Sequence, residues 1–219
     1  MAQSVEESGF AIVSRCLSEA TVDHLCTSLD ETKRAQRNLL DIPIVRELAV
    51  SEPVKQLVTA CLGKECFAVR GILFNKTPDS NWKVAWHQDR TIAVRARKDV
   101  AAFGPWSVKA GVPSVQPPAA VMAKMLAIRL HLDESHENNG PLRVIPGSHK
   151  VGCLSMEEVA FWRERPSVIC TVPRGGAILM RPLLLHASAS CLTPVPRRVI
   201  HLEFATENLP GGLEWHDQV

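Results

Sequence analysis

The sequence has 219 residues, of which 46% are hydrophobic and 22% are charged, and these values indicate a globular protein with a sizeable core. Its formal net charge of +2 is close to neutral, and the Lys and Arg residues are scattered. This argues against a nucleic-acid-binding surface and against a polybasic membrane patch. We therefore expect a small-molecule partner, while composition leaves the oligomeric state open.

The N-terminal segment and the cysteines both favour a cytoplasmic protein. The segment MAQSVEESGF is acidic, and no apolar run approaches the length of a membrane span, so we expect neither a signal peptide nor a spanning helix. The seven cysteines are dispersed, and no C-x-x-C pair suggests a zinc site or a redox motif. They fit reduced thiols of a cytosolic protein.

Two helices are predicted in the first part of the chain, about residues 1–63. In LSEATVDHLCTSLDETKRAQ, Ser18 is a candidate N-cap and apolar residues follow at helical spacing. In SEPVKQLVTACLGK, Ser51 is the candidate cap, Pro53 lies in the first turn and Gly63 ends the helix.

From Cys66 onward the pattern changes to short β-prone segments separated by Pro, Gly and Asn. They are CFAVRGILF, VAWHQDRTIAV, MLAIRLHLD, LRVIPGS, SVICTVP, GAILMRP and RVIHLEFA. We predict a mainly β fold, an antiparallel sandwich or barrel with the helices packed outside. The segment 95–120 reads as a long irregular loop. With no linker in the sequence, we expect one domain over 1–219, with a β core at about 66–206.

The block His87-Gln88-Asp89-Arg90 interrupts the apolar segment 84–94. In a strand, residues i and i+2 point to the same face, so His87 and Asp89 are expected to project together, which suits two ligands of one metal. A buried histidine–carboxylate hydrogen bond, or two solvent-facing side chains, would give the same short motif.

A third ligand candidate is His186, which interrupts the apolar run GGAILMRPLLLHASAS. Two histidines and one carboxylate form a facial triad typical of non-haem Fe(II) oxygenases, many of which use 2-oxoglutarate. The far carboxylate of 2-oxoglutarate needs a fixed cation. An antiparallel return across the turn LTPVP would bring Arg197 or Arg198 alongside the His186 strand, where a guanidinium can grip a carboxylate.

Several longer motifs resemble the phytanoyl-CoA dioxygenase family of Fe(II)/2-oxoglutarate oxygenases. They are WHQD, NGPLRVIPGSHK and LLHASASCLTPVPRR, together with the opening GFAIVSRCLSEATVDHL. The similarity spans most of the chain, and the ordered set is highly specific to the family. The resemblance implies a double-stranded β-helix, a jelly-roll variant with the metal site inside one mouth.

Matched position by position, the resemblance makes His87, Asp89 and His186 the iron ligands. Arg197, at the family's usual offset from the distal histidine, would bind the C5 carboxylate of 2-oxoglutarate, and Ser188 would assist it. Arg198 is the alternative to Arg197, because strand alternation allows only one of the pair to face inward.

Two further residues come from the same resemblance. Trp106 falls close to the position where the family has a tryptophan near the co-substrate, and Lys76 falls at the mouth of the site. A hydrophobic loop anchor and a surface lysine explain these two residues equally well. We also expect the segment that carries Arg95, Arg97 and Trp106 to border the substrate, and the arginines favour an anionic one.

The resemblance implies an oxygenase that uses Fe(II), 2-oxoglutarate and O2 and releases succinate and CO2. Because Asp89 retains the carboxylate ligand that related halogenases lack, hydroxylation of an unactivated C–H bond is favoured, although desaturation, epimerisation and ring closure use the same triad. The alternatives are a cupin-like metal-dependent isomerase or lyase, a zinc hydrolase or an inactive binding module. His131 and His201 lie in predicted strands, and we interpret them as hydrogen-bonded core histidines rather than as a fourth ligand.

Overall fold

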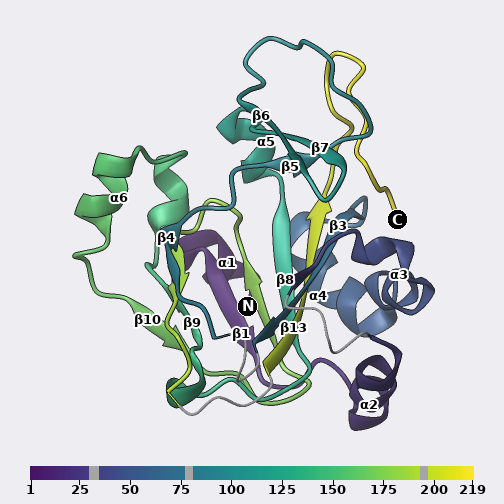
Figure 1. Cartoon of the computed structure of the whole chain (residues 1–219), viewed down its shortest axis with the longest axis vertical. Helices are drawn as coiled ribbons and strands as arrows, with labels where there is room; N and C mark the ends of the chain where they lie inside the picture. Colours follow the sequence, from purple (N-terminus) through teal and green to yellow (C-terminus); the bar gives the residue numbers. More distant parts are fainter. Residues whose placement is uncertain (30–34, 77–80, 193–196) are drawn as a thin grey trace.

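The computed structural model describes residues 1–29, 35–76, 81–192 and 197–219. Two antiparallel sheets form its centre (Figure 1). The six-stranded sheet has the order β1 (Phe10–Val13), β11 (Ala177–Met180), β8 (Leu126–His131), β13 (Arg197–Ala205), β3 (Phe67–Lys76), β2 (Ala35–Gln36). The four-stranded sheet has the order β10 (Val168–Cys170), β9 (Leu142–Val144), β12 (His186–Ser188), β4 (Val84–His87). All the β segments predicted from the sequence therefore contain strands.

The central strands of the six-stranded sheet alternate between two environments. On β13, Ile200 and Leu202 are fully buried in the main hydrophobic core, whereas His201 and Glu203 point to the opposite face, toward the other sheet. This is the period-2 pattern of a strand with different partners on its two faces. Part of the space between the sheets is filled by a smaller apolar cluster that includes Leu142 and Ile178, and the remainder is a cavity.

Four helices contribute to the main core on the outer side of the six-stranded sheet (Figure 1). They are α1 (Ala2–Ser8), α2 (Glu19–Ser28), α3 (Pro43–Ala49) and α4 (Glu52–Leu62), with the 3-10 turn η1 (Leu39–Asp41) before α3. The predicted cap of α2 is confirmed, because the Thr21 N–H donates to Ser18 Oγ at 3.1 Å. α4 starts after Ser51 and ends at Gly63 with a φ of 88°, as predicted, but the Ser51 side chain donates to the Leu48 carbonyl and does not cap the helix. The helices α1 and α3 were not predicted from the sequence.

The remaining helical elements lie after the metal-motif segment. They are α5 (Ala119–Ala123), α6 (Met156–Trp162) and the 3-10 turns η2 (Glu137–Asn139) and η3 (Ser148–Val151). α6 lies at the left of Figure 1, where its Val159 and Trp162 pack against a small apolar cluster of Ile145, Leu154 and Leu185. No helix among the described residues is both long enough and apolar enough to cross a membrane.

The prediction of an irregular loop over residues 95–120 was wrong for part of that segment. A three-stranded sheet runs β5 (Ile92–Ala93), β7 (Val112–Val115), β6 (Trp106–Lys109), at the top of Figure 1. β6 and β7 form a hairpin whose two linking residues, Ala110 and Gly111, both have positive φ. Alanine rarely adopts that conformation, so the sequence carried a weak turn signal there.

Candidate metal centre

The histidine and the carboxylate of the H-x-D motif converge in a different way from the one expected. β4 ends at His87, so Asp89 lies beyond the strand, in the connection to β5. Its backbone N–H donates to the Pro182 carbonyl at 3.0 Å, which ties this connection to the segment before β12. The prediction that His87 and Asp89 project together was right, but their shared strand face was the wrong reason.

Gln88 separates the two residues and anchors the connection. Its Nε2 donates to the carbonyls of Gly152 and Leu183 at 2.8 and 2.7 Å, and its Oε1 accepts from the Leu154 N–H at 2.8 Å. Only 8% of Gln88 is exposed. Because all these bonds are buried and satisfied, Gln88 fixes where the chain turns and therefore where Asp89 is presented.

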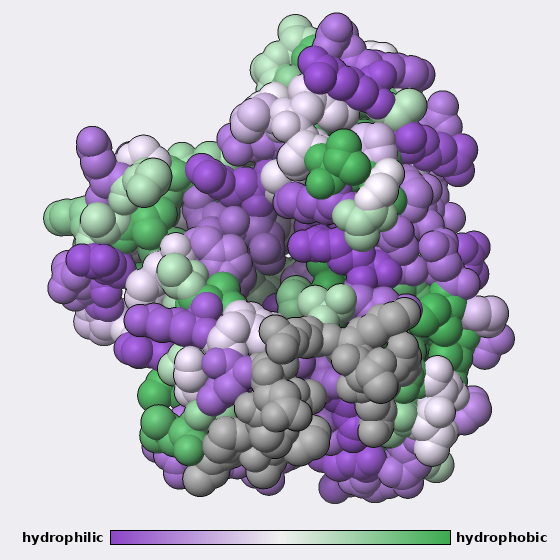
Figure 2. Space-filling model, viewed as in Figure 1, coloured by the Kyte–Doolittle hydropathy of each residue, from purple (hydrophilic) through white to green (hydrophobic). Residues whose placement is uncertain are grey.

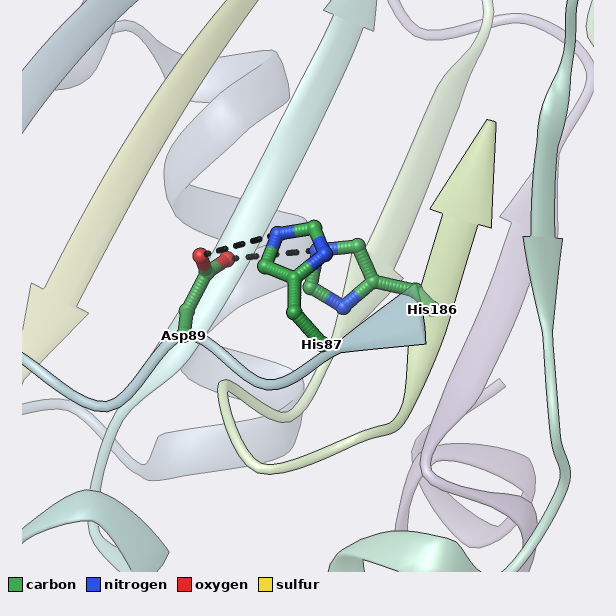
Figure 3. Close-up of side chains that lie close together, drawn as sticks. All are labelled: His87, Asp89 and His186. Atoms are coloured by element: carbon green, nitrogen blue, oxygen red, sulfur yellow. Dashed lines mark ion pairs between the residues drawn. The ribbon is translucent and has the colours of Figure 1, made fainter. Parts of the chain in front are cut away.

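His186 reaches the same place from the neighbouring strand. β12 pairs with β4 so that His186 stands opposite His87, and their ring centroids are 4.2 Å apart. His87 Nε2 lies 3.9 Å from Asp89 Oδ1, and His186 Nε2 lies 3.7 Å from Asp89 Oδ2 (Figure 3). One ligand atom from each residue lies within 4.8 Å of the other two.

Both histidines are held in the same way by the backbone. His87 Nδ1 lies 2.8 Å from the Ala85 carbonyl, and His186 Nδ1 lies 2.8 Å from the Leu184 carbonyl. A carbonyl only accepts, so both Nδ1 atoms carry the proton and both Nε2 lone pairs are left for a metal. This is the tautomer that a divalent metal requires.

The ionisation states also suit a metal. Burial lowers the pKa of His186 to about 4, so its imidazole is neutral at neutral pH. Burial raises the pKa of Asp89, but the neighbouring imidazoles, His186 first, outweigh it and lower that pKa overall. The site therefore offers the Nε2 atoms of His87 and His186 and one carboxylate, the donor set of the facial triad.

A second group of potential ligands shares Asp89, because one ligand atom each from Asp89, His201 and Glu203 lies within 4.8 Å of the others. Here the groups are already engaged. Glu203 forms an ion pair with Arg70 and accepts from His201 Nε2 at 3.1 Å, while His201 Nδ1 lies 3.3 Å from Arg129. This arrangement is a buried hydrogen-bonded network, and it agrees with the prediction that His201 is a hydrogen-bonded core histidine.

His131 differs from that prediction. It is 1% exposed, and neither of its ring nitrogens has a hydrogen-bond partner in the described part of the chain. Burial lowers its pKa well below the ordinary value, so the ring is neutral.

The triad opens into a cavity of about 490 Å³ between the two sheets. In Figure 2 the molecule is hollowed between the part that carries α6 and the part that carries β5 to β7, and mostly hydrophilic residues surround the hollow. Among the described residues, two acidic side chains line the cavity, Asp89 and Glu203, against seven basic ones: Arg37, Arg70, Lys76, Arg90, Lys109, Arg129 and Arg197. The excess is larger than the net charge of +2 on the whole chain, so positive charge is concentrated here.

One end of the cavity brings together three residues that the sequence singled out. Arg197 is 5% exposed and stands opposite Lys76 in the β13–β3 register. Lys76 Nζ donates to Ser188 Oγ at 3.2 Å and to the Ala189 carbonyl at 2.6 Å. Burial and the charge of Arg197 lower the pKa of Lys76 to about 8, and burial and Arg129 lower the pKa of Arg197 to about 10.

Arg197 and Arg198 point to opposite sides of β13, as expected of neighbours in a strand. Arg197 lines the cavity, whereas the Arg198 guanidinium donates to both carboxylate oxygens of Asp133 at 2.9 and 2.8 Å. The expected pairing of this strand with the His186 strand was wrong. β13 belongs to the six-stranded sheet, so Arg197 faces His186 across the cavity. Residues 193–196 of the predicted turn lie outside the described residues.

Trp106 is not among the residues that line the cavity, so the structure gives no support to its predicted place beside the co-substrate. The indole packs against an apolar cluster that contains Val115 and Trp215, and the Arg97 guanidinium lies 5.5 Å from the centroid of the Trp106 ring. Burial in that cluster fixes the ring away from the metal motif.

The segment that was expected to border the substrate does reach the cavity, through Pro105, Lys109 and Gln116. The two arginines singled out in that segment do not line it: Arg95 forms an exposed ion pair with Glu214 at 3.0 Å, and Arg97 lies against Trp106.

Comparison with known proteins decides the family. The model of the phytanoyl-CoA dioxygenase (PhyH) family matches residues 28–199. The chain belongs to the phytanoyl-CoA dioxygenase family. This family consists of Fe(II)/2-oxoglutarate-dependent oxygenases, so Fe(II), 2-oxoglutarate and O2 are the cofactor and co-substrates to which the centre must be compared.

The curated members of the phytanoyl-CoA dioxygenase family that match are distant relatives. The ectoine dioxygenase of Sphingopyxis alaskensis is 23% identical over a match that covers 71% of this chain and 51% of the relative. The peroxisomal phytanoyl-CoA dioxygenase of Bos taurus is 22% identical, with 93% and 67% covered. The chain thus spans between half and two thirds of the length of these relatives.

Solved structures agree on the fold. The crystal structure of EctD from S. alaskensis with 2-oxoglutarate and 5-hydroxyectoine is similar with a TM-score of 0.69 at 21% identity, covering 93% of this chain and 74% of that one. The 2-oxoglutarate-dependent carbocyclase SnoK from nogalamycin biosynthesis has a TM-score of 0.71 at 14% identity, with 94% and 83% covered. The predicted double-stranded β-helix is confirmed.

Proposed function

We propose that this protein is an Fe(II)- and 2-oxoglutarate-dependent oxygenase that hydroxylates an unactivated C–H bond of a small molecule, with release of succinate and CO2. In this proposal His87, Asp89 and His186 hold the iron. The observation that carries it is the convergence of two backbone-anchored imidazoles and one carboxylate at the wall of a cavity that also contains the buried Arg197.

The residues fit the metal on the evidence of their own chemistry. In each histidine the Nδ1–H is directed at a backbone carbonyl, so Nε2 is the nitrogen that faces the metal position, and the Asp89 carboxylate is ionised. When bound, Fe(II) would activate O2 with 2-oxoglutarate as the electron donor, and O2 would be the oxidant of the substrate C–H bond. The chain supplies the positions and the charges.

Arg197 would hold the C5 carboxylate of 2-oxoglutarate. Its guanidinium is buried, its Nε has no hydrogen-bond partner among the described residues, and no carboxylate there lies within ion-pair distance of it. A buried cation without a counter-charge is costly, and a ligand carboxylate would offset that cost. Ser188 and Lys76, which already bond to one another, stand beside the same end of the cavity and would accompany Arg197 in that role.

The test is an anaerobic titration of the Fe(II)-loaded protein with 2-oxoglutarate, followed through the weak visible charge-transfer band of the chelate. We expect a saturable band in the wild type and in His24→Ala, whose histidine is exposed on α2, and no band in His186→Ala. A folded, iron-loaded wild type without the band would contradict the proposal and favour the isomerase, lyase or binding-module alternatives, none of which needs 2-oxoglutarate.

A further inference from the structure

Five of the seven basic residues that line the cavity fall into two separate groups. Arg197 stands opposite Lys76 at one end of the β13–β3 pair, and Glu203 stands opposite Arg70 further along it. Six residues of extended strand separate Arg70 from Lys76, a distance of about 20 Å. The proposed co-substrate anchor and the Arg70 region are therefore different places in one cavity.

Arg37 and Lys109 join the cavity on the Arg70 side. Arg37 follows the edge strand β2, Lys109 is the last residue of β6, and both line the cavity. Desolvation, with the charge of Arg70 next, lowers the pKa of Arg37, and desolvation followed by Arg70 and Arg37 lowers the pKa of Lys109. The geometry agrees: Arg37 follows Gln36, which stands opposite Leu73 on β3, and Lys109 Nζ donates to Thr91, two residues after Asp89. The three cations therefore gather on one side of the cavity.

Only one of these three cations has a counter-charge of its own. Arg70 is paired with Glu203. Lys109 Nζ donates to the neutral Thr91 Oγ1 at 2.7 Å, and in the ranges that the structure describes neither Arg37 nor Lys109 has a carboxylate within ion-pair distance. Like charges gathered in a partly desolvated site destabilise it unless an anion joins them.

The proposed function does not employ Arg37 or Lys109. Under it, the iron compensates Asp89, and Arg197 with Lys76 receives the C5 carboxylate. The cation pair formed by Arg37 and Lys109 is therefore available to a further ligand. The guanidinium can bind a carboxylate or phosphate through two parallel hydrogen bonds, and the ammonium adds a point charge.

We propose that the primary substrate is a small anion whose carboxylate or phosphate group binds Arg37 and Lys109. This inference rests on the proposed function, since it names the substrate class of the same site. The metal centre lies toward this side of the cavity, because an Asp89 oxygen is within 4.8 Å of ligand atoms of both His201 and Glu203, the last of which pairs with Arg70. The carbon that reacts is accordingly close to the anionic group of the substrate.

The first arm of the test measures anion binding directly. Inorganic phosphate and acetate are titrated calorimetrically into the anaerobic Fe(II)·2-oxoglutarate protein, so that the anchor at Arg197 is already filled. We expect saturable binding of at least one anion, weakened about tenfold by Arg37→Gln and by Lys109→Gln. Arg95→Gln, which removes an exposed arginine outside the cavity, should leave binding unchanged.

The second arm separates the two kinds of anion. Succinate formation is measured with matched pairs of small molecules, each carboxylate against its amide and each phosphate monoester against its alcohol. We expect stimulation only by charged members, and Arg37→Gln should raise the concentration for half-maximal stimulation about tenfold.

Three outcomes would overturn the inference. They are no saturable anion binding to the 2-oxoglutarate complex, equal binding by the Arg37→Gln/Lys109→Gln double variant, or equal stimulation by neutral members. Each is distinct from failure of the proposed function, in which no 2-oxoglutarate complex forms in the first place.

Discussion

The two sheets that enclose the cavity contribute opposite kinds of chemistry to it. The four-stranded sheet and the connection after β4 contribute His87, Asp89 and His186, which are held by bonds to nearby backbone carbonyls or by the anchored Gln88. The six-stranded sheet contributes charged side chains from β3, β8 and β13, which face the cavity from the middle of apolar strands.

The difference teaches how one interior can support both a ligand set and a charged lining. Backbone carbonyls orient neutral imidazoles at little electrostatic cost, whereas guanidinium and carboxylate groups must compensate one another when they are buried. The six-stranded sheet can carry charge toward the cavity because its other face is packed against the helices in the main core. Its stability and its ligand affinity should therefore depend on charge balance.

The largest effect is expected on the ligand side. Asp89→Ala removes the only carboxylate of the triad, so iron binding and activity should be lost. Asp99→Ala is the control, since Asp99 is an exposed acidic residue in the same region of the sequence. Iron per chain, measured by metal analysis after desalting, checks the prediction. Iron retained in Asp89→Ala but lost in Glu203→Ala would move the metal to the second group.

The next largest effect is expected on stability, when one partner of a charged pair in the six-stranded sheet is removed. Glu203→Ala leaves Arg70 buried without its counter-charge, which should lower the free energy of unfolding by about 3–5 kcal/mol. Urea unfolding measures this loss. The double variant Arg70→Met/Glu203→Leu removes both charges and should recover most of it. A loss below about 1 kcal/mol in Glu203→Ala would show that the pair is effectively solvated.

A third change distinguishes the two faces of β13. Arg197→Ala should raise the 2-oxoglutarate concentration for half-maximal activity about 100-fold, because it removes charge-assisted hydrogen bonds to the co-substrate. Arg198→Ala should change that concentration less than about twofold and act on stability instead, since its partner is Asp133. Titration of both variants with 2-oxoglutarate measures this concentration. A larger increase in Arg198→Ala than in Arg197→Ala would contradict the assignment of Arg197 as the co-substrate anchor.

The smallest effect concerns Lys76, whose pKa falls from the ordinary value of 10.5 in the unfolded chain to about 8 on folding. Between these values the unfolded chain binds more protons than the folded one, so the Lys76 contribution to stability rises with pH. The unfolding free energy of the wild type, minus that of Lys76→Met, should therefore increase by about 2 kcal/mol from pH 8 to pH 10. A difference that does not change with pH would contradict the lowered pKa.

Much of the fold follows from local patterns in the sequence. The β-branched runs predicted the strands. Side chains alternate between the two faces of a strand, and this alternation also predicted that only one of Arg197 and Arg198 faces the cavity. The β6–β7 hairpin was not predicted, because Ala110 is not a typical turn residue. The end of β4 at His87 was not predicted either, because no residue near it is typical of a strand end, and Asp89 was therefore expected on the strand.

The charged lining could not be assembled from the sequence in the same way. Arg37, Arg70 and Lys109 come from three segments that meet only through the tertiary fold. One signal was nevertheless present: Arg70, Arg129 and Glu203 each interrupt an otherwise apolar strand, as His87 does. A charged residue in such a place needs a buried partner or a ligand, as a histidine there does.

Gln88 has a consequence for hydrogen exchange. The Leu154 N–H donates to the Gln88 side chain, a long way along the sequence from it, so the exchange rate of this one amide reports whether the metal-motif connection is closed. A slow Leu154 amide in the metal-free protein would mean that the connection is ordered before iron arrives. A fast amide that becomes protected on loading would mean that part of the binding free energy is used to order it.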